Sequence, residues 1–343
     1  LIMGRVSKWF FLVYILFLNS CSRTEKIQIV EFSGNREQIL SEEMAELDIT
    51  VFDTLVFLHK YSSENFFSVY SKDQKLIKGD WLKNGNGPGE FTAPKFIKQI
   101  GTQKLFVYDI FKGGLFQLKP DNPDLEIDFV SNLDPVFGLT QDMILKNDSI
   151  LIGNLGYLSP EAYLVKGFDF KNQKDLFLIP IPDLAEYENI GVSDFYTVFY
   201  NFFRMKPDGS KSVLAFNYFD RMLILDEDFQ VKKEFLGATG LKGLKIVEGE
   251  PVDLVNYYFD LEVTDDYIFA LYYDQPESQY GEVMQSTQIR IFDWNGTLLN
   301  IIEVPDYLMG ITFDEKNQTL YGVDHFQEKI VKYDFADLLK DLN

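Results

Sequence analysis

Cysteine and histidine are almost absent from this sequence. Cys21 is the single cysteine among 343 residues, and His59 and His325 are the only histidines. A lone cysteine forms no intramolecular disulfide, and the chain after it has no thiol for nucleophilic catalysis or for thiolate metal sites. Two isolated histidines also provide no spaced pair of the kind that binds zinc. The sequence therefore excludes a disulfide scaffold, a cysteine-dependent enzyme and a histidine-pair zinc site.

Basic residues are also scarce. Lysine and arginine number 32 against 53 aspartates and glutamates, which gives a formal net charge of −21. A surface of that charge repels phosphate backbones and anionic membranes, so we expect no nucleic acid among the partners. The composition is otherwise that of a folded protein, with 46% hydrophobic residues. Its aromatic content of 16% favours strands over exposed helices.

An apolar run lies at the N-terminus, over residues 9–18, and follows the basic residues Arg5 and Lys8. A membrane-spanning helix requires about 20 apolar residues, so a run this short indicates a secretory signal rather than a stable anchor.

The run ends in Leu18-Asn19-Ser20-Cys21, which resembles the lipobox of bacterial lipoproteins, whose cysteine becomes diacylated. The resemblance implies a signal peptide over residues 1–20, a lipidated tether over 21–26 and a folded domain over 27–343. It also implies that the membrane is a partner, with the lipid at Cys21 anchoring the protein to either face of the outer membrane. The alternative is an ordinary cleaved signal in which the cysteine is incidental.

An internal repeat organises the rest of the chain. A short apolar strand with a polar end is followed by a turn and a second apolar strand, as in residues 105–109 and 114–118. Six such strands recur about fifty residues apart, near positions 58, 109, 154, 217, 272 and 324. This recurrence is typical of β-propellers, and the short apolar runs lack the period of a helical solenoid. We predict an all-β fold, a six-bladed β-propeller.

The two ends of the chain predict how the ring closes. The last unit supplies three strands, at residues 310–313, 320–324 and 330–333, whereas residues 27–32 form a strand with no blade of its own. We predict that residues 27–32 become the outer strand of the last blade, because this closure removes an exposed edge.

Segments 53–57, 75–78 and 83–94 resemble the first blade of six-bladed propeller lipoproteins of Bacteroidetes, the TolB-like propeller group. The stretch 85–91 also resembles the linker between NHL repeats. The resemblance extends over most of residues 27–335. It implies a six-bladed propeller in the cell envelope, and it implies neither an enzymatic activity nor a particular ligand.

The glycine-rich stretch 85–91 invites comparison with a phosphate loop. It lacks the Lys-Ser/Thr pair that such a loop requires, and Pro94 follows too closely for the helix of a phosphate loop. We therefore predict a structural turn between blades, in which the glycines permit unusual backbone angles and a carboxylate caps backbone N–H groups. The residues of this predicted turn are Gly85, Gly87, Gly89 and Glu90.

Polar residues at or near the strand ends are the first candidates for ligand binding, because propeller loops converge around the central channel. These candidates are Asp109, Asn154, Asp220, Asp274, Asp324 and His325. The alternative is that each acid accepts backbone hydrogen bonds within its own turn. No motif predicts a cofactor. The spacing of the acids neither predicts nor excludes a calcium ion in the channel.

Aromatic residues in long insertions are the second group of candidates. Tyr157 and Tyr280 lie in insertions after the second strands of units three and five, where they could stack on a sugar ring or a peptide side chain. A further aromatic cluster spans residues 187–203. The alternative is that these rings pack the core and hold the loops down.

Three hypotheses about function follow. The first is a lipoprotein of the cell envelope whose propeller binds a glycan, a peptide or an envelope protein through its loop face. The second is a hydrolase or lyase of an extracellular polymer, although the sequence has no Gly-x-Ser-x-Gly element. The third is a structural partner within a membrane complex. Fold analogy alone does not choose among them.

Overall fold

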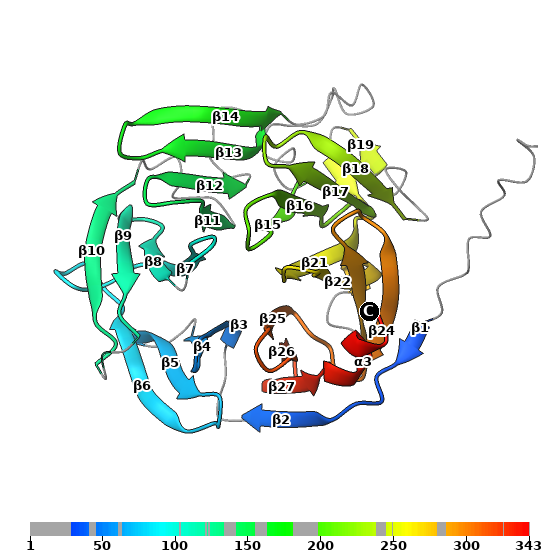
Figure 1. Cartoon of the computed structure of the whole chain (residues 1–343), viewed down its shortest axis with the longest axis horizontal. Helices are drawn as coiled ribbons and strands as arrows, with labels where there is room; N and C mark the ends of the chain where they lie inside the picture. Colours follow the sequence, from blue (N-terminus) through cyan, green and yellow to red (C-terminus); the bar gives the residue numbers. More distant parts are fainter. Residues whose placement is uncertain are drawn as a thin grey trace, which may run out of the picture.

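Each sequence repeat folds into one β-sheet, and six sheets stand around a central axis (Figure 1). The prediction of an all-β six-bladed propeller is therefore confirmed. The computed structural model describes residues 29–40, 46–60, 64–102, 104–120, 122, 124–133, 142–154, 163–180, 198–237, 245–248, 250–279, 286–324 and 326–342.

The first three blades are four-stranded antiparallel sheets that run from the axis outward in chain order. Blade one contains β3 (Glu46–Phe52), β4 (Leu55–Lys60), β5 (Asn65–Ser71) and β6 (Leu76–Lys83). Blade two contains β7 (Pro94–Lys98), β8 (Leu105–Asp109), β9 (Gly114–Leu118) and β10 (Ile127–Asn132). Blade three contains β11 (Met143–Leu145), β12 (Ile150–Asn154), β13 (Tyr163–Asp169) and β14 (Lys174–Pro180).

The next two blades repeat this order. Blade four contains β15 (Asn201–Met205), β16 (Lys211–Phe216), β17 (Arg221–Asp226) and β18 (Val231–Leu236). Blade five contains β21 (Val255–Val263), β22 (Tyr267–Pro276), β23 (Thr287–Asp293) and β24 (Leu298–Val304). The hairpin of β19 (Lys245–Val247) and β20 (Glu250–Val252) lies between these blades, and the 3-10 turn η3 (Glu277–Gln279) follows β22.

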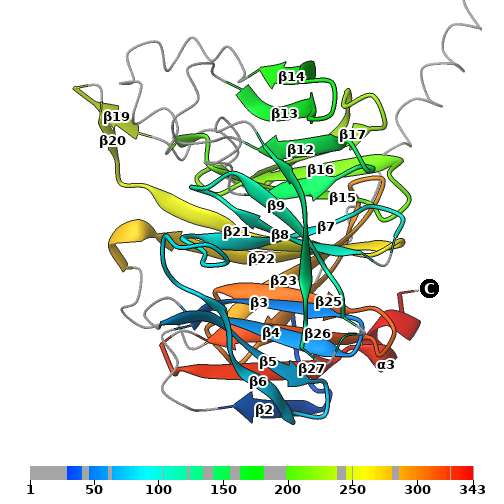
Figure 2. The ribbon, with the colours of Figure 1, turned by 90° about the vertical axis from the view of Figure 1, so that its left-hand side faces the viewer.

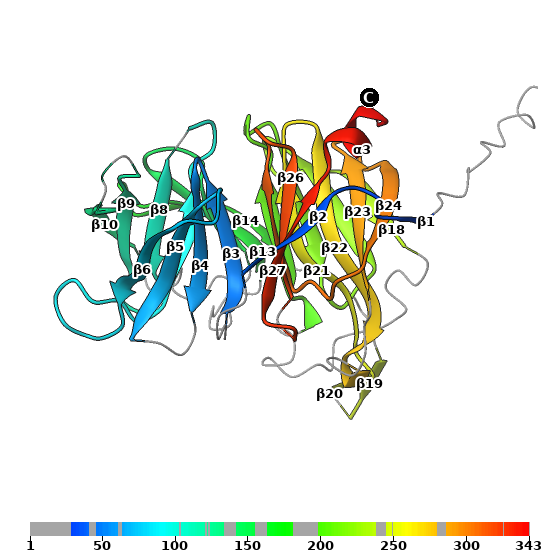
Figure 3. The ribbon, with the colours of Figure 1, turned by 90° about the horizontal axis from the view of Figure 1, so that it is seen from below.

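The last blade joins the two ends of the chain. It contains β25 (Gly310–Asp314), β26 (Thr319–Asp324) and β27 (Lys329–Asp334), and the short helix α3 (Ala336–Lys340) follows. Helix α3 and the hairpin β19–β20 mark opposite faces of the ring (Figures 2 and 3).

The pattern of burial follows from face-to-face packing of the blades. Strand β8 is buried at all five positions, because side chains on both of its faces meet a neighbouring blade. The outermost strand of the same blade, β10, is mostly exposed. Apolar clusters fill each interface between adjacent blades, including the closing one, where Ile49 of blade one packs with Val323 of blade six.

The closing strand is β2 (Arg36–Leu40), which pairs antiparallel with β27 as the outer strand of blade six. The prediction that an N-terminal strand closes the last blade is confirmed, but the prediction that residues 27–32 form this strand is wrong. The described part of that segment, β1 (Ile29–Glu31), instead adds a parallel fifth strand to blade five beside β24. The ring of Phe32, between the two strands, packs 5.1 Å from that of Tyr333. The N-terminal segment therefore adds one strand to blade five and the next strand to blade six.

A buried ion-pair cluster fixes the closing strand to the ring. Asp306, in the crossover from blade five to blade six, has a fully buried side chain. It accepts hydrogen bonds from the guanidinium of Arg36 at 2.6 Å and 2.5 Å, and the Nζ of Lys329 lies 2.6 Å away. The hydroxyl of Tyr333 also donates to it. We call these four residues the closing cluster.

The glycine-rich stretch forms the crossover from β6 to β7. The carboxylate of Glu90 accepts a hydrogen bond from Gly87 N–H at 2.8 Å and pairs with Lys83 at 2.7 Å. Gly85 has a φ of 155°, and a Cβ there would lie 2.1 Å from the Glu90 carboxylate. Gly89 also has a positive φ, at 76°. Phe91, which ends the stretch, is buried between blades one and two.

Candidate functional site

A cavity of about 1280 Å³ occupies the centre of the ring. Its walls come from the innermost strands of the blades and from the turns at their ends. Every blade contributes a residue at its inner wall: Asp48, Lys95, Asp142, Arg204, Asp260 and Thr312, from blades one to six in order. Charged side chains of both signs therefore surround the axis.

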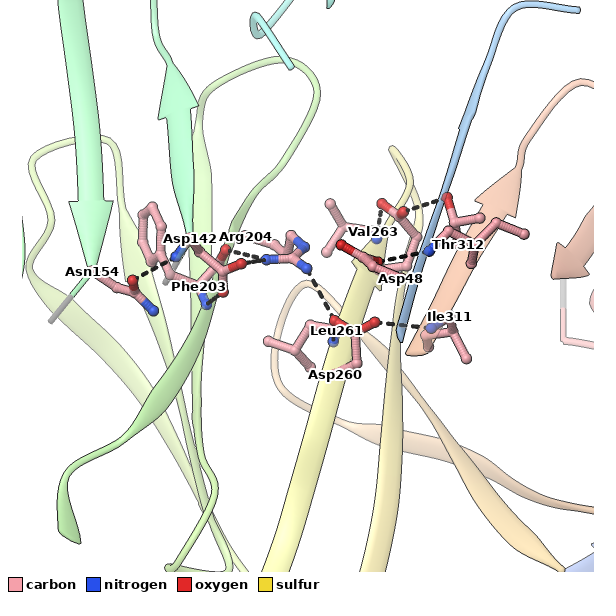
Figure 4. A network of polar contacts seen from close by, with 12 residues as sticks. Asp48, Asp142, Asn154, Phe203, Arg204, Asp260, Leu261, Val263, Ile311 and Thr312 are labelled. Carbon is pink, nitrogen blue, oxygen red and sulfur yellow. Dashed lines mark hydrogen bonds and ion pairs between the residues drawn. The ribbon is translucent and has the colours of Figure 1, made fainter. Parts of the chain in front are cut away.

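Arg204 joins three blades across this cavity. Its guanidinium lies 2.7 Å from a carboxylate oxygen of Asp142 in blade three and 3.0 Å from one of Asp260 in blade five (Figure 4). Asp142 also accepts the N–H of Phe203 at 3.0 Å, and Asp260 accepts that of Ile311 in blade six at 2.9 Å. The network thus links four consecutive blades, and the two carboxylates bond inner-strand N–H groups.

A second charged group lies beside the first. Glu262, two residues along β21 from Asp260, accepts a hydrogen bond from the hydroxyl of Thr312 at 3.1 Å. The Nζ of Lys98 in blade two lies 3.2 Å from the same carboxylate. Because Lys98 belongs to blade two and Glu262 to blade five, this ion pair spans the axis of the ring.

The first blade adds a carboxylate, that of Asp48, which accepts fewer backbone hydrogen bonds than that of Asp260. Asp48 accepts a hydrogen bond from the N–H of its neighbour Ile49 at 2.8 Å, and its side chain faces the cavity. Lys95 and His59 lie close to it on the same wall. The His59 ring stacks on that of Phe67, with 4.7 Å between centroids.

Burial shifts the ionisation of these groups. It raises the pKa of Asp260 to about 7, with the like charges of Asp48 and Asp142 acting in the same direction and Arg204 opposing. Asp48 is exposed toward the cavity, but loss of bulk water there raises its pKa, and the charge of Lys95 opposes the shift. Burial opposes ionisation of Glu262 too, but the charges of Lys98 and Arg204 outweigh it and lower its pKa.

The pKa values of the cationic groups in the cavity shift in opposite directions. Burial lowers the pKa of Lys95, although Asp142 and Asp48 oppose the shift. Burial also acts against the charge of Arg204, but the neighbouring carboxylates prevail and raise its pKa. Burial, followed by the charge of Lys95, lowers the pKa of His59 to about 4. His59 is therefore neutral near pH 7.

The structure places two of the predicted strand-end residues in turns and blade contacts. Asp109 is buried and accepts hydrogen bonds from Thr92 and from the N–H groups of Phe111 and Lys112. Asn154 is buried and accepts the N–H of Asp142 at 2.8 Å. Asn154 thereby positions a residue of the cavity wall without lining the cavity itself.

The other predicted acids lie outside the cavity as well. Asp220 is buried with its carboxylate 3.5 Å from Arg290, and Gly237 packs so closely that a Cβ there would clash with Asp220. Asp324 is buried, accepts the N–H of Gln327 and lies 3.4 Å from Lys329. Asp274 is exposed, with a φ of 54°. As ligand contacts these acids stay predictions.

Cys21, Tyr157, Tyr280 and His325 fall outside the described residues. So do three rings of the aromatic cluster, Tyr187, Phe195 and Tyr196. The described remainder of that cluster packs at least in part into the core: Phe199 and Phe203 are buried in the interface of blades three and four. Within the described part of the chain, no three His, Cys, Asp or Glu side chains gather in a way that could hold a metal ion. Nor do the described residues include a helix able to span a membrane.

Sequence reasoning missed the residues of the cavity wall. Their signal is a charge inside an otherwise apolar strand, as Arg204 in Phe-Phe-Arg-Met and Asp260 with Glu262 in Phe-Asp-Leu-Glu-Val. In a propeller the innermost strand has one neighbour and faces the axis, so a charge there meets the charges of other blades.

The fold and its cavity define a six-bladed β-propeller with a charged central channel, a framework suited to a binding or scaffold module. The chain belongs to the TolB-like 6-blade propeller-like family, which matches residues 45–316. The resemblance to TolB-like propellers is confirmed.

Solved structures share the fold at low sequence identity. A protein of Bacteroides fragilis classed as exported is 11% identical, with a TM-score of 0.50 over 86% of this chain and 88% of that one. The calcium-binding protein regucalcin of Agrobacterium tumefaciens is also 11% identical, with a TM-score of 0.51 over 89% and 95%. No curated protein matches the sequence.

Proposed function

We propose that this protein is an extracytoplasmic lipoprotein, anchored through Cys21, whose propeller binds a glycan, a peptide or an envelope protein at its central channel. The observation that carries the proposal is the cavity of about 1280 Å³ with charged side chains from all around the ring. A volume of this order exceeds a drug-sized ligand pocket, and a cavity with a few fixed polar groups is the usual form of a binding site. The propeller supplies the rigid frame.

The alternative is a hydrolase or lyase that acts on an extracellular polymer. Asp260 favours it, because a carboxyl with a pKa of about 7 beside ionised groups is the pattern of an acid catalyst. The same carboxylate, however, already accepts bonds from Arg204, Leu261 and Ile311. These three bonds hold the Asp260 carboxylate between the blades, which favours a structural role for it over acid catalysis.

Filling the channel tests the binding proposal. Thr50 lies half-buried on the cavity wall in β3, so Thr50→Trp should occupy the space a ligand needs. In a thermal-shift screen of oligosaccharides and peptides, a ligand at about 100 times its Kd stabilises the full-length protein by about 2.7 kcal/mol. We expect such a ligand to raise the Tm of the native protein by several degrees and to leave the Tm of Thr50→Trp unchanged. Thr297→Trp, which alters an exposed turn, is the control and should keep the gain in Tm. A ligand that stabilises both variants equally would place the site elsewhere.

Replacement of Cys21 tests the anchor. A diacylated cysteine has two acyl chains, and each buried CH₂ adds about 0.8 kcal/mol to membrane affinity. We expect Cys21→Ala to move the protein from the membrane fraction to the soluble fraction after cell fractionation, whereas Ser22→Ala should leave it in the membrane. Retention of Cys21→Ala in the membrane would contradict the lipoprotein proposal.

A further inference from the structure

The cavity wall has more acidic than basic side chains. Among the described residues that line the cavity, carboxylates outnumber lysine and arginine side chains nine to six. Lys104 lies 3.4 Å from Asp148, which is not part of the cavity wall, whereas Lys72 pairs at 2.6 Å with Asp314, one of the lining carboxylates. The protein as a whole has a formal charge of −21. A cavity with this excess in a negative protein attracts cations and repels anions.

The bases are unevenly distributed: blade six contributes Lys316 from the turn after β25, but the inner strand β25 itself has no cationic side chain. Blade two supplies Lys95 and Lys98, and blade four supplies Arg204 between two acids. The inner strand of blade six contributes to the network the N–H of Ile311 and the hydroxyl of Thr312, which are both neutral. Acids of the neighbouring blades, Asp48 and Asp260, therefore flank an inner strand with no cationic side chain of its own. This is where a positive group of a ligand is best accommodated.

Aromatic rings form the other component of the wall. Phe96 and Phe259 are partly buried, line the cavity and come from blades two and five. Phe96 is held by contacts with Phe57 and Phe67, each 4.8 Å between centroids, and Phe259 packs 4.8 Å from Tyr273. Rings fixed in this way contact the apolar body of a ligand, and their faces attract a cation.

We propose that the channel binds an organic cation, an ammonium or guanidinium group on a short apolar chain, with Asp48 as its principal counter-ion. The proposal rests on the function proposed above and specifies its ligand. Asp48 is suited to the role because its carboxylate is exposed to the cavity and accepts a hydrogen bond from the adjacent backbone N–H, while Lys95 acts on it through charge. Asp142, Asp260 and Glu262 are held by bonds between blades.

A matched series of five-carbon probes tests this on the full-length protein in detergent. Cadaverine, 1,5-pentanediol and glutarate share their length and differ in charge. We expect isothermal titration calorimetry to show binding of cadaverine, weakened by added salt, and at least tenfold weaker binding of the other two. Nα-acetyl-lysine methylamide is the second cationic probe. Tighter binding of this probe would identify a peptide side chain as the source, and tighter binding of cadaverine would identify a free amine.

Variants locate the counter-ion. Asp48→Asn keeps the oxygen that accepts the Ile49 N–H and removes the charge, so we expect about tenfold weaker cadaverine binding with the fold intact. Asp337→Asn, on the exposed helix α3, is the control and should bind as the native protein does. Unchanged binding in Asp48→Asn, or preference for glutarate, would overturn the proposal. A different outcome would separate the two proposals: a glycan or neutral peptide binds, Thr50→Trp prevents that binding, and neither cationic probe binds. This result would support the proposed binding function and contradict the proposed cationic ligand.

Discussion

Asp306→Asn is expected to lower the free energy of unfolding by about 3 kcal/mol, because it removes the negative charge at the centre of the closing cluster. The Asp306 side chain is fully buried and Lys329 is 8% exposed, so little water replaces the lost carboxylate. Arg36, which ties the closing strand to the ring, loses its charged partner at the same time. Urea unfolding followed by tryptophan fluorescence measures the change.

An exposed ion pair on the same two strands provides the control. Glu37 of β2 and Lys332 of β27 lie 2.6 Å apart, with 52% and 27% of their side chains exposed. Solvent weakens such a pair, so Glu37→Gln should cost no more than about 1 kcal/mol. Equal losses in the two variants would show that strand pairing alone, without the buried charge, holds the closing strand.

Acid should weaken the closing cluster as the substitution does. Burial opposes the charge of Asp306, but hydrogen bonds from Arg36, Lys329 and Tyr333 outweigh it and lower the pKa of Asp306 to about 2. Because this pKa lies below that of the unfolded chain, the stabilisation is present above about pH 4 and is lost as the pH falls through about 2. The difference in the free energy of unfolding between the native protein and Asp306→Asn should therefore disappear in that pH range.

The fold could be predicted because its signal is local and repeated. Each blade places a buried strand such as β8 next to a second apolar strand, and the sequence repeats this pair about every fifty residues. Six recurrences of one local pattern identify a ring even where the intervening loops differ in length. Closure of the ring could also be predicted, since the last unit has too few strands.

The identity of the closing strand could not be predicted from apolar pattern. Residues 27–32 are more apolar than β2, which reads Arg-Glu-Gln-Ile-Leu. An outer strand is covered on few sides, so burial does not select the most apolar candidate. What distinguishes β2 is the contact of Arg36 with Asp306, 270 residues away, and no spacing in the sequence reveals such a pair.

The residues of the cavity were hidden for a related reason. A charge in an apolar strand ordinarily indicates a position that faces solvent, and only closure of the ring brings Asp142, Arg204 and Asp260 together. The acids at strand ends were easier to notice because they follow apolar runs. Asp109 shows why that pattern need not indicate a ligand: its carboxylate is already occupied by its own turn and Thr92.

Arg204→Met is expected to be the most damaging single substitution in the channel. It leaves the carboxylates of Asp142 and Asp260, 15% and 13% exposed, without the cation that both contact. Loss of one partner from such a group costs about 3–5 kcal/mol. Arg221→Met is the control, since its partner Glu234 is 37% exposed, and should cost about 1 kcal/mol or less.

The loss in Arg204→Met should depend on pH in a direction set by Asp260. Its pKa of about 7 lies above that of an unfolded aspartate, so its contribution to stability is present below about pH 4 and lost as the pH rises through about 7. Near pH 5 the Asp260 carboxyl is protonated and needs no cation, whereas near pH 8 it is charged. Chemical unfolding should therefore show a larger loss near pH 8 than near pH 5 in Arg204→Met. Asp260→Asn, which cannot ionise, should remove most of the decline in stability between these values. The same loss at both pH values would mean that Arg204 acts by packing between the blades and not by its charge.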